Sequence, residues 1–110
     1  MNNNFINEFK KLSKEAHQIA IEKDWYNQER SELELICLIH SELSEGVEGL
    51  RKNKKSNKIK GFLNIEEELA DTIIRIMDYS EFKNYRVGEA VIEKIKYNKN
   101  REYRHGNKKY

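Results

Sequence analysis

The chain has 110 residues, a net charge of +2 and an apolar share of only 37%, so it is long enough for one domain, residues 1–110, with a modest core. The absence of proline and the presence of only five glycines argue against a turn-rich β fold and favour long helices. No stretch is long and apolar enough to span a bilayer, no secretion signal is visible, and the single Cys37 excludes an internal disulfide. We therefore expect a cytoplasmic protein without a membrane partner.

The first predicted helix covers residues 4–23. Apolar residues recur there at spacings of three and four, namely Phe5, Phe9, Leu12, Ala16, Ile19 and Ala20. The pattern breaks at residues 24–28, and a second helix is predicted for residues 31–51. Because residues 33–43 are apolar on most sides, they predict the central helix of a bundle.

Residues 52–61 are polar and basic and end in glycine, which indicates a loop. A third helix is predicted for residues 64–82, with Asn64 as its N-cap and Glu67 as the partner in a capping box. Its expected core stripe consists of Ile65, Leu69, Ile73, Ile76 and Met77. A fourth helix follows Asn84-Tyr85 and ends near residue 100. The prediction is an all-α, four-helix bundle-like fold whose helical hairpins share a core across an oligomer interface.

The charges are distributed unevenly along the chain. Residues 1–50 contain ten acidic and five basic residues, residues 51–60 contain six basic and no acidic ones, and residues 94–110 contain seven basic residues and one acid. This order suits a site whose acids bind metal and whose distant cations bind phosphate. A solvated basic loop and a basic tail at about residues 101–110 explain the same pattern, and for residues 51–60 this simpler interpretation is favoured.

Two pairs of carboxylates stand at helical spacing. Glu42 and Glu45 are three residues apart and therefore share one helix face. Glu42 falls in the apolar arc of the second helix, beside Leu35, Leu38 and Ile39. An acid on an apolar face is costly unless a metal ion or a basic side chain compensates it.

Glu68 and Asp71 repeat this spacing on the third helix, on a strip opposite its apolar stripe. The pattern by itself favours a solvated acidic face with an ion pair from Asp71 to Arg75. Packed against Glu42 and Glu45, the same residues would form a site of four carboxylates. Oxygen ligands of this kind suit Mg²⁺, or Mn²⁺ as a substitute, and not zinc.

The two acidic segments, SELSEGVEGLR at residues 41–51 and EELADTIIRI at residues 67–76, closely resemble the MazG-like family of all-α nucleotide pyrophosphohydrolases. The segment KIKYNKNREYRHG at residues 94–106 resembles the tail of small single-domain members. His17 and Trp25 stand where such members carry these residue types. Glu102 departs from the family pattern, because proline often follows the tail arginine.

The resemblance implies hydrolysis of a nucleoside triphosphate to the monophosphate and pyrophosphate. It implies that Glu42, Glu45, Glu68 and Asp71 bind Mg²⁺ and that Glu45 also orients the attacking water. It further implies substrate contacts from Lys94, Asn98, Arg101, Tyr103, Trp25 and His17. It does not identify the nucleotide, and the candidates include dCTP, dUTP, modified or damaged nucleotides and, more distantly, phosphoribosyl-ATP.

Simpler interpretations exist for these candidate substrate contacts. Lys94 alone is typical of a surface lysine, Trp25 of a cap over the core, and His17 of a structural histidine. Gly46 and Gly49 weaken the second helix, and we expect a neighbouring helix or a phosphate to approach them closely.

A non-catalytic helical oligomer or regulator that binds a nucleotide or a partner protein is the alternative function. We expect no nucleic-acid partner, because no aromatic residues are interleaved with the basic residues of the segment 51–60. The first fifty residues are also acidic. A homodimer or homotetramer is expected, because the apolar middle of the second helix exceeds what four short helices cover.

Overall fold

The computed structural model describes residues 2–101, which form four α-helices. These are α1 (Asn2–Glu22), α2 (Glu32–Arg51), α3 (Asn64–Lys83) and α4 (Val87–Lys99). The predicted all-α fold is confirmed, and all four helices lie close to their predicted bounds. No helix within residues 2–101 has both the length and the apolar character needed to cross a membrane.

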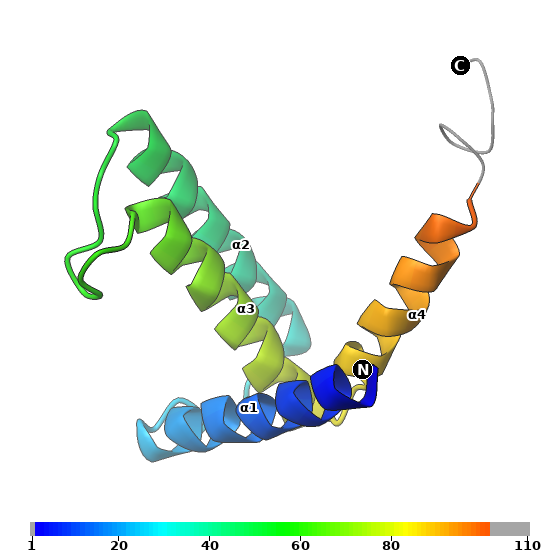
Figure 1. The fold of residues 1–110 in the computed structure, drawn as a ribbon. Coiled ribbons are helices and arrows are strands. Elements are labelled where there is room, and N and C mark those ends of the chain that lie inside the picture. The colour runs from blue at the N-terminus through cyan, green and yellow to red at the C-terminus, as the bar shows by residue number, and fades with distance from the viewer. Residues whose placement is uncertain (1, 102–110) are drawn as a thin grey trace.

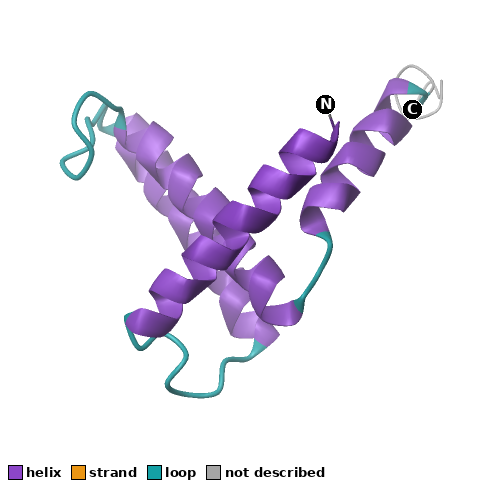
Figure 2. Cartoon of the chain, turned by 60° about the horizontal axis from the view of Figure 1, so that its bottom comes forward, coloured by secondary structure: helices purple, strands orange, loops and turns teal. Residues whose placement is uncertain are grey.

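α2 and α3 lie side by side as a helical hairpin, whose connecting loop is at the upper left of Figure 1. α1 crosses this hairpin and packs against α3, while α4 packs against α1 and points away from the hairpin. Figure 2 shows α1 crossing the hairpin, with α4 next to the N-terminal part of α1. Within one chain α3 is thus the central helix, and the prediction that the second helix is central is wrong, because α1 packs mainly on α3.

Side chains and backbone turns define the helix ends. The Ser31 hydroxyl accepts a hydrogen bond from the Leu33 amide at 3.1 Å and caps α2. At the start of α3 the cap position is Leu63, whose amide donates to Glu66 Oε1 at 2.8 Å. The predicted cap at Asn64 is therefore wrong by one residue, because it is the Glu66 carboxylate that satisfies the free amide.

The two glycines of α2 allow α3 to approach closely, which confirms the expectation for a neighbouring helix. A Cβ atom on Gly46 would lie 2.8 Å from Ile65 Cδ1. A Cβ atom on Gly49 would lie 1.8 Å from Asn64 Oδ1, so the Asn64 side chain would have to move. Both glycines are buried, so α2 and α3 pack through the helix segment that also carries Glu42 and Glu45.

The most buried face of α3 differs from the predicted one. Leu69 and Ile73, from the predicted core stripe, are 47% and 50% exposed, whereas Glu68, Thr72 and Asp78 are buried. Within one chain the prediction of this stripe as the core is therefore wrong for Leu69 and Ile73, whereas Ile65, Ile76 and Met77 are half-buried. Among residues 2–101, Leu35 is the only large apolar residue that is buried, at 5% exposure.

Candidate functional site

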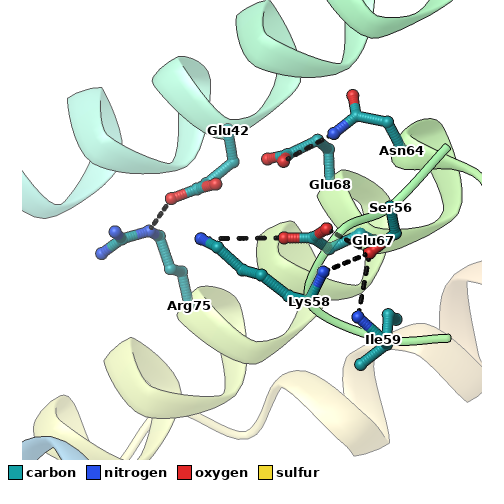
Figure 3. A network of polar contacts seen from close by, with 8 residues as sticks. All are labelled: Glu42, Ser56, Lys58, Ile59, Asn64, Glu67, Glu68 and Arg75. Carbon is teal, nitrogen blue, oxygen red and sulfur yellow. Dashed lines mark hydrogen bonds and ion pairs between the residues drawn. The ribbon is translucent and has the colours of Figure 1, made fainter. Parts of the chain in front are cut away.

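The buried polar face of α3 meets α2 at a cluster of three carboxylates. Glu42 of α2 and Glu68 and Asp71 of α3 each offer an oxygen, and these oxygens all lie within 4.8 Å of one another. Figure 3 shows Glu42 and Glu68 extending from the two helices into the same space. The interpretation of Glu68 and Asp71 as a solvated face is wrong, because Glu68 is only 6% exposed and Asp71 is half-buried.

Glu68 is the most buried of the three carboxylates. Its Oε2 atom is buried and has no hydrogen-bond partner among residues 2–101, and its Oε1 atom accepts only a long hydrogen bond of 3.5 Å from Asn64. Burial, reinforced by the neighbouring Glu42 and Glu45 carboxylates, raises the pKa of Glu68 to about 7. An unpaired buried carboxylate beside other acids is the environment in which a bound cation lowers the free energy most.

Glu42 differs from Glu68 because the chain provides it with a cation. Arg75 Nε donates to Glu42 Oε1 at 2.7 Å across the α2–α3 interface. Burial is the largest single influence and favours the protonated form of Glu42. The hydrogen bond from Arg75, its positive charge and hydrogen bonding with Glu68 and Glu45 together outweigh burial and hold the pKa of Glu42 below its ordinary value. The predicted pair between Asp71 and Arg75 is replaced by this contact between helices.

Asp71 and Glu45 complete the acidic group that the sequence predicts. Burial, followed by the charges of Glu42 and Glu67, raises the pKa of Asp71. Glu45 is exposed and lies outside the cluster of three, but it lines the same cavity. The structure therefore brings all four predicted acids together, three of them closely.

These acids line a cavity of about 470 Å³ between α1, α2 and α3. That volume falls in the range of small-molecule sites. One side of the cavity is formed by Ala16, Ile19 and Ala20 of α1 together with Trp25. Its charged lining consists of Glu42, Glu45, Glu68, Asp71 and Asp78 with Lys23, Lys58 and Arg75. The excess of acids over bases suits a divalent cation, and the bases suit a polyanion held by it.

The basic loop at residues 52–61 contributes one of these cations. Ser56 organises the loop: its hydroxyl donates to Glu67 Oε1 at 2.6 Å and accepts from the amides of Lys58 at 3.2 Å and Ile59 at 3.0 Å (Figure 3). The Lys58 ammonium lies 3.9 Å from Glu67 Oε2 and borders the cavity. The loop is therefore anchored to α3 and is more than a solvated segment.

Asp78 is a cavity residue that the sequence did not single out as a site residue. It is buried, with His17 Nδ1 2.7 Å from Oδ1 and the Tyr26 hydroxyl donating to Oδ2 at 2.8 Å. Burial and the Asp78 carboxylate both raise the pKa of Tyr26. The sequence signal for Asp78 was its place on the acidic strip of α3, seven residues after Asp71.

His17, predicted to contact the substrate, contacts Asp78 and is not among the residues that line the cavity.

Trp25 lines the cavity, as its predicted role requires. Two guanidinium groups lie over its ring, Arg30 at 4.5 Å and Arg75 at 5.0 Å from the ring centre. Arg30 Nε also donates to the Trp25 carbonyl oxygen at 2.8 Å. These contacts fix the indole near the carboxylates.

The predicted phosphate-binding residues of α4 are not brought to this cavity within one chain. Lys94 lies with its ammonium 4.4 Å from the ring centre of Tyr97 and borders a separate apolar hollow on α4. Asn98 and Arg101 are exposed. Tyr103 lies outside the described residues.

Comparisons of the chain with family models, with curated proteins and with solved structures gave no match.

Proposed function

We propose that the chain is a Mg²⁺-dependent nucleoside triphosphate pyrophosphohydrolase, which converts a nucleoside triphosphate and water to the monophosphate and pyrophosphate. The observation that carries the proposal is the buried, unpaired Oε2 of Glu68 beside Glu42 and Asp71. Such a group calls for a hard cation bound through oxygen. The resemblance of the two acidic motifs to MazG-like enzymes supplies the reaction class.

In this proposal Glu42, Glu45, Glu68 and Asp71 hold the metal, with Mn²⁺ as a substitute. The bound metal would polarise phosphate oxygens and lower the pKa of a coordinated water. Lys58 and Lys23 border the cavity and stabilise negative charge on the phosphates. Glu45, exposed at the cavity, is suited to orient the attacking water, and Trp25 offers an aromatic face to the base.

The proposal includes a homodimer or homotetramer in the cytoplasm. Its support is the large apolar surface of the single chain, which contains Leu33, Val47, Leu50, Leu69 and Ile73, all at least 47% exposed. Exposed apolar residues in this number are typical of interfaces between proteins. A second chain would also cover Ile36 and Leu43, which are the exposed large apolar residues in the middle of α2 apart from Leu33.

One observation favours the alternative, a non-catalytic helical oligomer or regulator. Arg75 already neutralises Glu42, so part of the acidic cluster is compensated without metal. Under this alternative, Mg²⁺ neither raises the melting temperature nor permits turnover.

The test is a panel of nucleoside triphosphates incubated with Mg²⁺ and assayed for pyrophosphate. We expect release from at least one nucleotide and a loss of about 100-fold or more in Glu42→Gln and in Asp71→Asn, because each removes a metal ligand. Glu93→Gln, an exposed acid on α4, is the matched control and should keep full activity. Release undiminished in the two site variants rejects the site, and no release from any nucleotide supports the alternative.

A further inference from the structure

Asp78 lies on α3, the helix that also carries Glu68 and Asp71 of the proposed metal site. Glu68, Asp71, Arg75 and Asp78 follow one another at spacings of three and four, so they share one face of α3. Seven residues separate Asp71 from Asp78, which corresponds to about 10 Å along the axis. All four line the same cavity, and Trp25 lines it with them. This separation is comparable to that between the α-phosphate and the Watson–Crick edge of an extended nucleotide.

The surroundings of Asp78 leave it as a hydrogen-bond acceptor. It is 7% exposed, and each oxygen accepts one hydrogen bond, from His17 at 2.7 Å and from Tyr26 at 2.8 Å. Because a carboxylate only accepts, the facing His17 Nδ1 carries the proton of that bond. Two carboxylate oxygens offer about four acceptor positions, so one remains on each oxygen.

The two protein donors also fix the orientation of the carboxylate. The His17 and Tyr26 rings pack edge to face, with their centres 4.9 Å apart, and the Tyr26 and Phe82 rings lie 4.6 Å apart. His17 and Tyr26 are thus positioning residues for Asp78. A carboxylate held in this way offers a ligand two adjacent acceptors at a fixed spacing.

Building on the proposed function, we propose that Asp78 binds the Watson–Crick edge of the base and makes guanine the preferred base of this site. Guanine alone among the common bases presents two adjacent donors, N1–H and the N2 amino group, to a carboxylate. Adenine and cytosine present an amino donor beside a ring acceptor. Uracil and thymine present one N–H between two carbonyl oxygens, which the carboxylate repels.

Binding is tested with the α,β-methylene triphosphates of guanosine, inosine and uridine and with Mg²⁺, by calorimetry on the full chain. We expect the guanosine compound to bind about tenfold more tightly than the uridine compound, as for other bidentate contacts to a base. The inosine compound, which lacks the N2 amino group, should bind with intermediate affinity. This comparison needs no substitution, so it does not depend on the folding of a variant.

Asp78→Asn then replaces one acceptor with a donor, so the guanosine preference should fall to about one or reverse towards uridine. Asp24→Asn removes an exposed carboxylate from the segment after α1 and should leave the preference unchanged. Equal weakening of both compounds in Asp78→Asn would show a structural role and overturn the inference. So would equal binding of the guanosine and inosine compounds to the unaltered chain.

The proposed function is judged separately, by pyrophosphate release. Hydrolysis without a base preference that depends on Asp78 overturns this inference and leaves the function standing. A guanosine preference that depends on Asp78, without hydrolysis of any nucleotide, rejects the function and supports Asp78 as the base-binding residue of a nucleotide-binding protein.

Discussion

Arg75 Nε lies 2.7 Å from Glu42 Oε1, so that α3 supplies the counter-ion for the buried acid of α2. The same guanidinium lies 5.0 Å from the ring centre of Trp25. Arg75 therefore connects the acidic cluster with the aromatic side of the cavity. Its positive charge compensates the Glu42 carboxylate without a bound cation.

Replacing Arg75 tests this compensation. Arg75→Gln should lower the free energy of unfolding of the metal-free protein by about 2 kcal/mol, because Glu42 then remains buried without a cation. Saturating Mg²⁺ should reduce the loss, since the metal neutralises the same carboxylate. Urea denaturation with and without Mg²⁺ measures both effects.

The control for this prediction is Arg51→Gln. Arg51 lies 3.8 Å from Glu48 in an exposed pair on α2, and such pairs contribute about 0.5 kcal/mol or less. Equal losses in Arg75→Gln and Arg51→Gln would contradict the assignment of Arg75 as the counter-ion of Glu42.

The raised pKa of Glu68 predicts how the stability of the metal-free protein depends on pH. The folded chain binds this proton more tightly than the unfolded chain, whose Glu68 has the ordinary pKa of 4.5. The resulting stabilisation is present below pH 4.5 and is lost as the pH rises to about 7. Urea unfolding from pH 4 to pH 8 should therefore show a decline relative to Glu68→Gln, which lacks this titration.

At pH 8 we expect Glu68→Gln to be the more stable metal-free protein by about 1 kcal/mol or more, because it removes an unpaired buried charge. The same variant should lose most of the stabilisation by Mg²⁺. Parallel pH profiles for Glu68→Gln and the unaltered chain would show that Glu68 titrates normally.

The two glycines of α2 make different demands on α3. Gly49→Ala places a methyl group 1.8 Å from Asn64 Oδ1, whereas Gly46→Ala meets the flexible end of Ile65 at 2.8 Å. Both substitutions gain about 1 kcal/mol of helix propensity. Overpacking typically costs about 1–3 kcal/mol, so we expect Gly49→Ala to be less stable than Gly46→Ala in thermal unfolding.

Shortening the opposing side chain should relieve the strain at Gly49. The double variant Gly49→Ala, Asn64→Ala is expected to recover part of the lost stability, because the amide group is removed. A Gly49→Ala protein as stable as Gly46→Ala would contradict the close packing of α2 on α3.

The exposed stripe of α3 predicts an interface between copies. Ile73→Lys places a charge at a half-exposed apolar position, so it should dissociate the assembly without unfolding the chain. Light scattering after size-exclusion chromatography should show a dimer or tetramer for the unaltered chain and a smaller species for the variant. Gln18→Lys, at an exposed position on α1, should leave the assembly intact, and a monomeric unaltered chain would refute the interface.

The sequence by itself determined the four helices and their approximate ends. The spacing of apolar residues and the absence of proline are local properties, and local hydrogen bonds and propensities act on them directly. It also identified the four acids that the structure brings to one cavity. The spacing of three within each pair is enough to place both members on one helix face.

Only the tertiary structure decided which face of α3 is covered. Periodicity separates the acidic strip from the stripe of Leu69 and Ile73, but it does not say which of the two another helix will meet. The approach of α2 through Gly46 and Gly49 buries the acidic strip, and this in turn pairs Arg75 with Glu42.

The contacts of Asp78 were equally beyond the sequence. They join α1, the segment after it and α3, over separations of 61 residues to His17 and 52 residues to Tyr26. No local pattern encodes such contacts, because they depend on the angle at which α1 crosses the hairpin. The sequence therefore specified the chemical groups of the site, and the packing of the helices decided which groups face the same cavity.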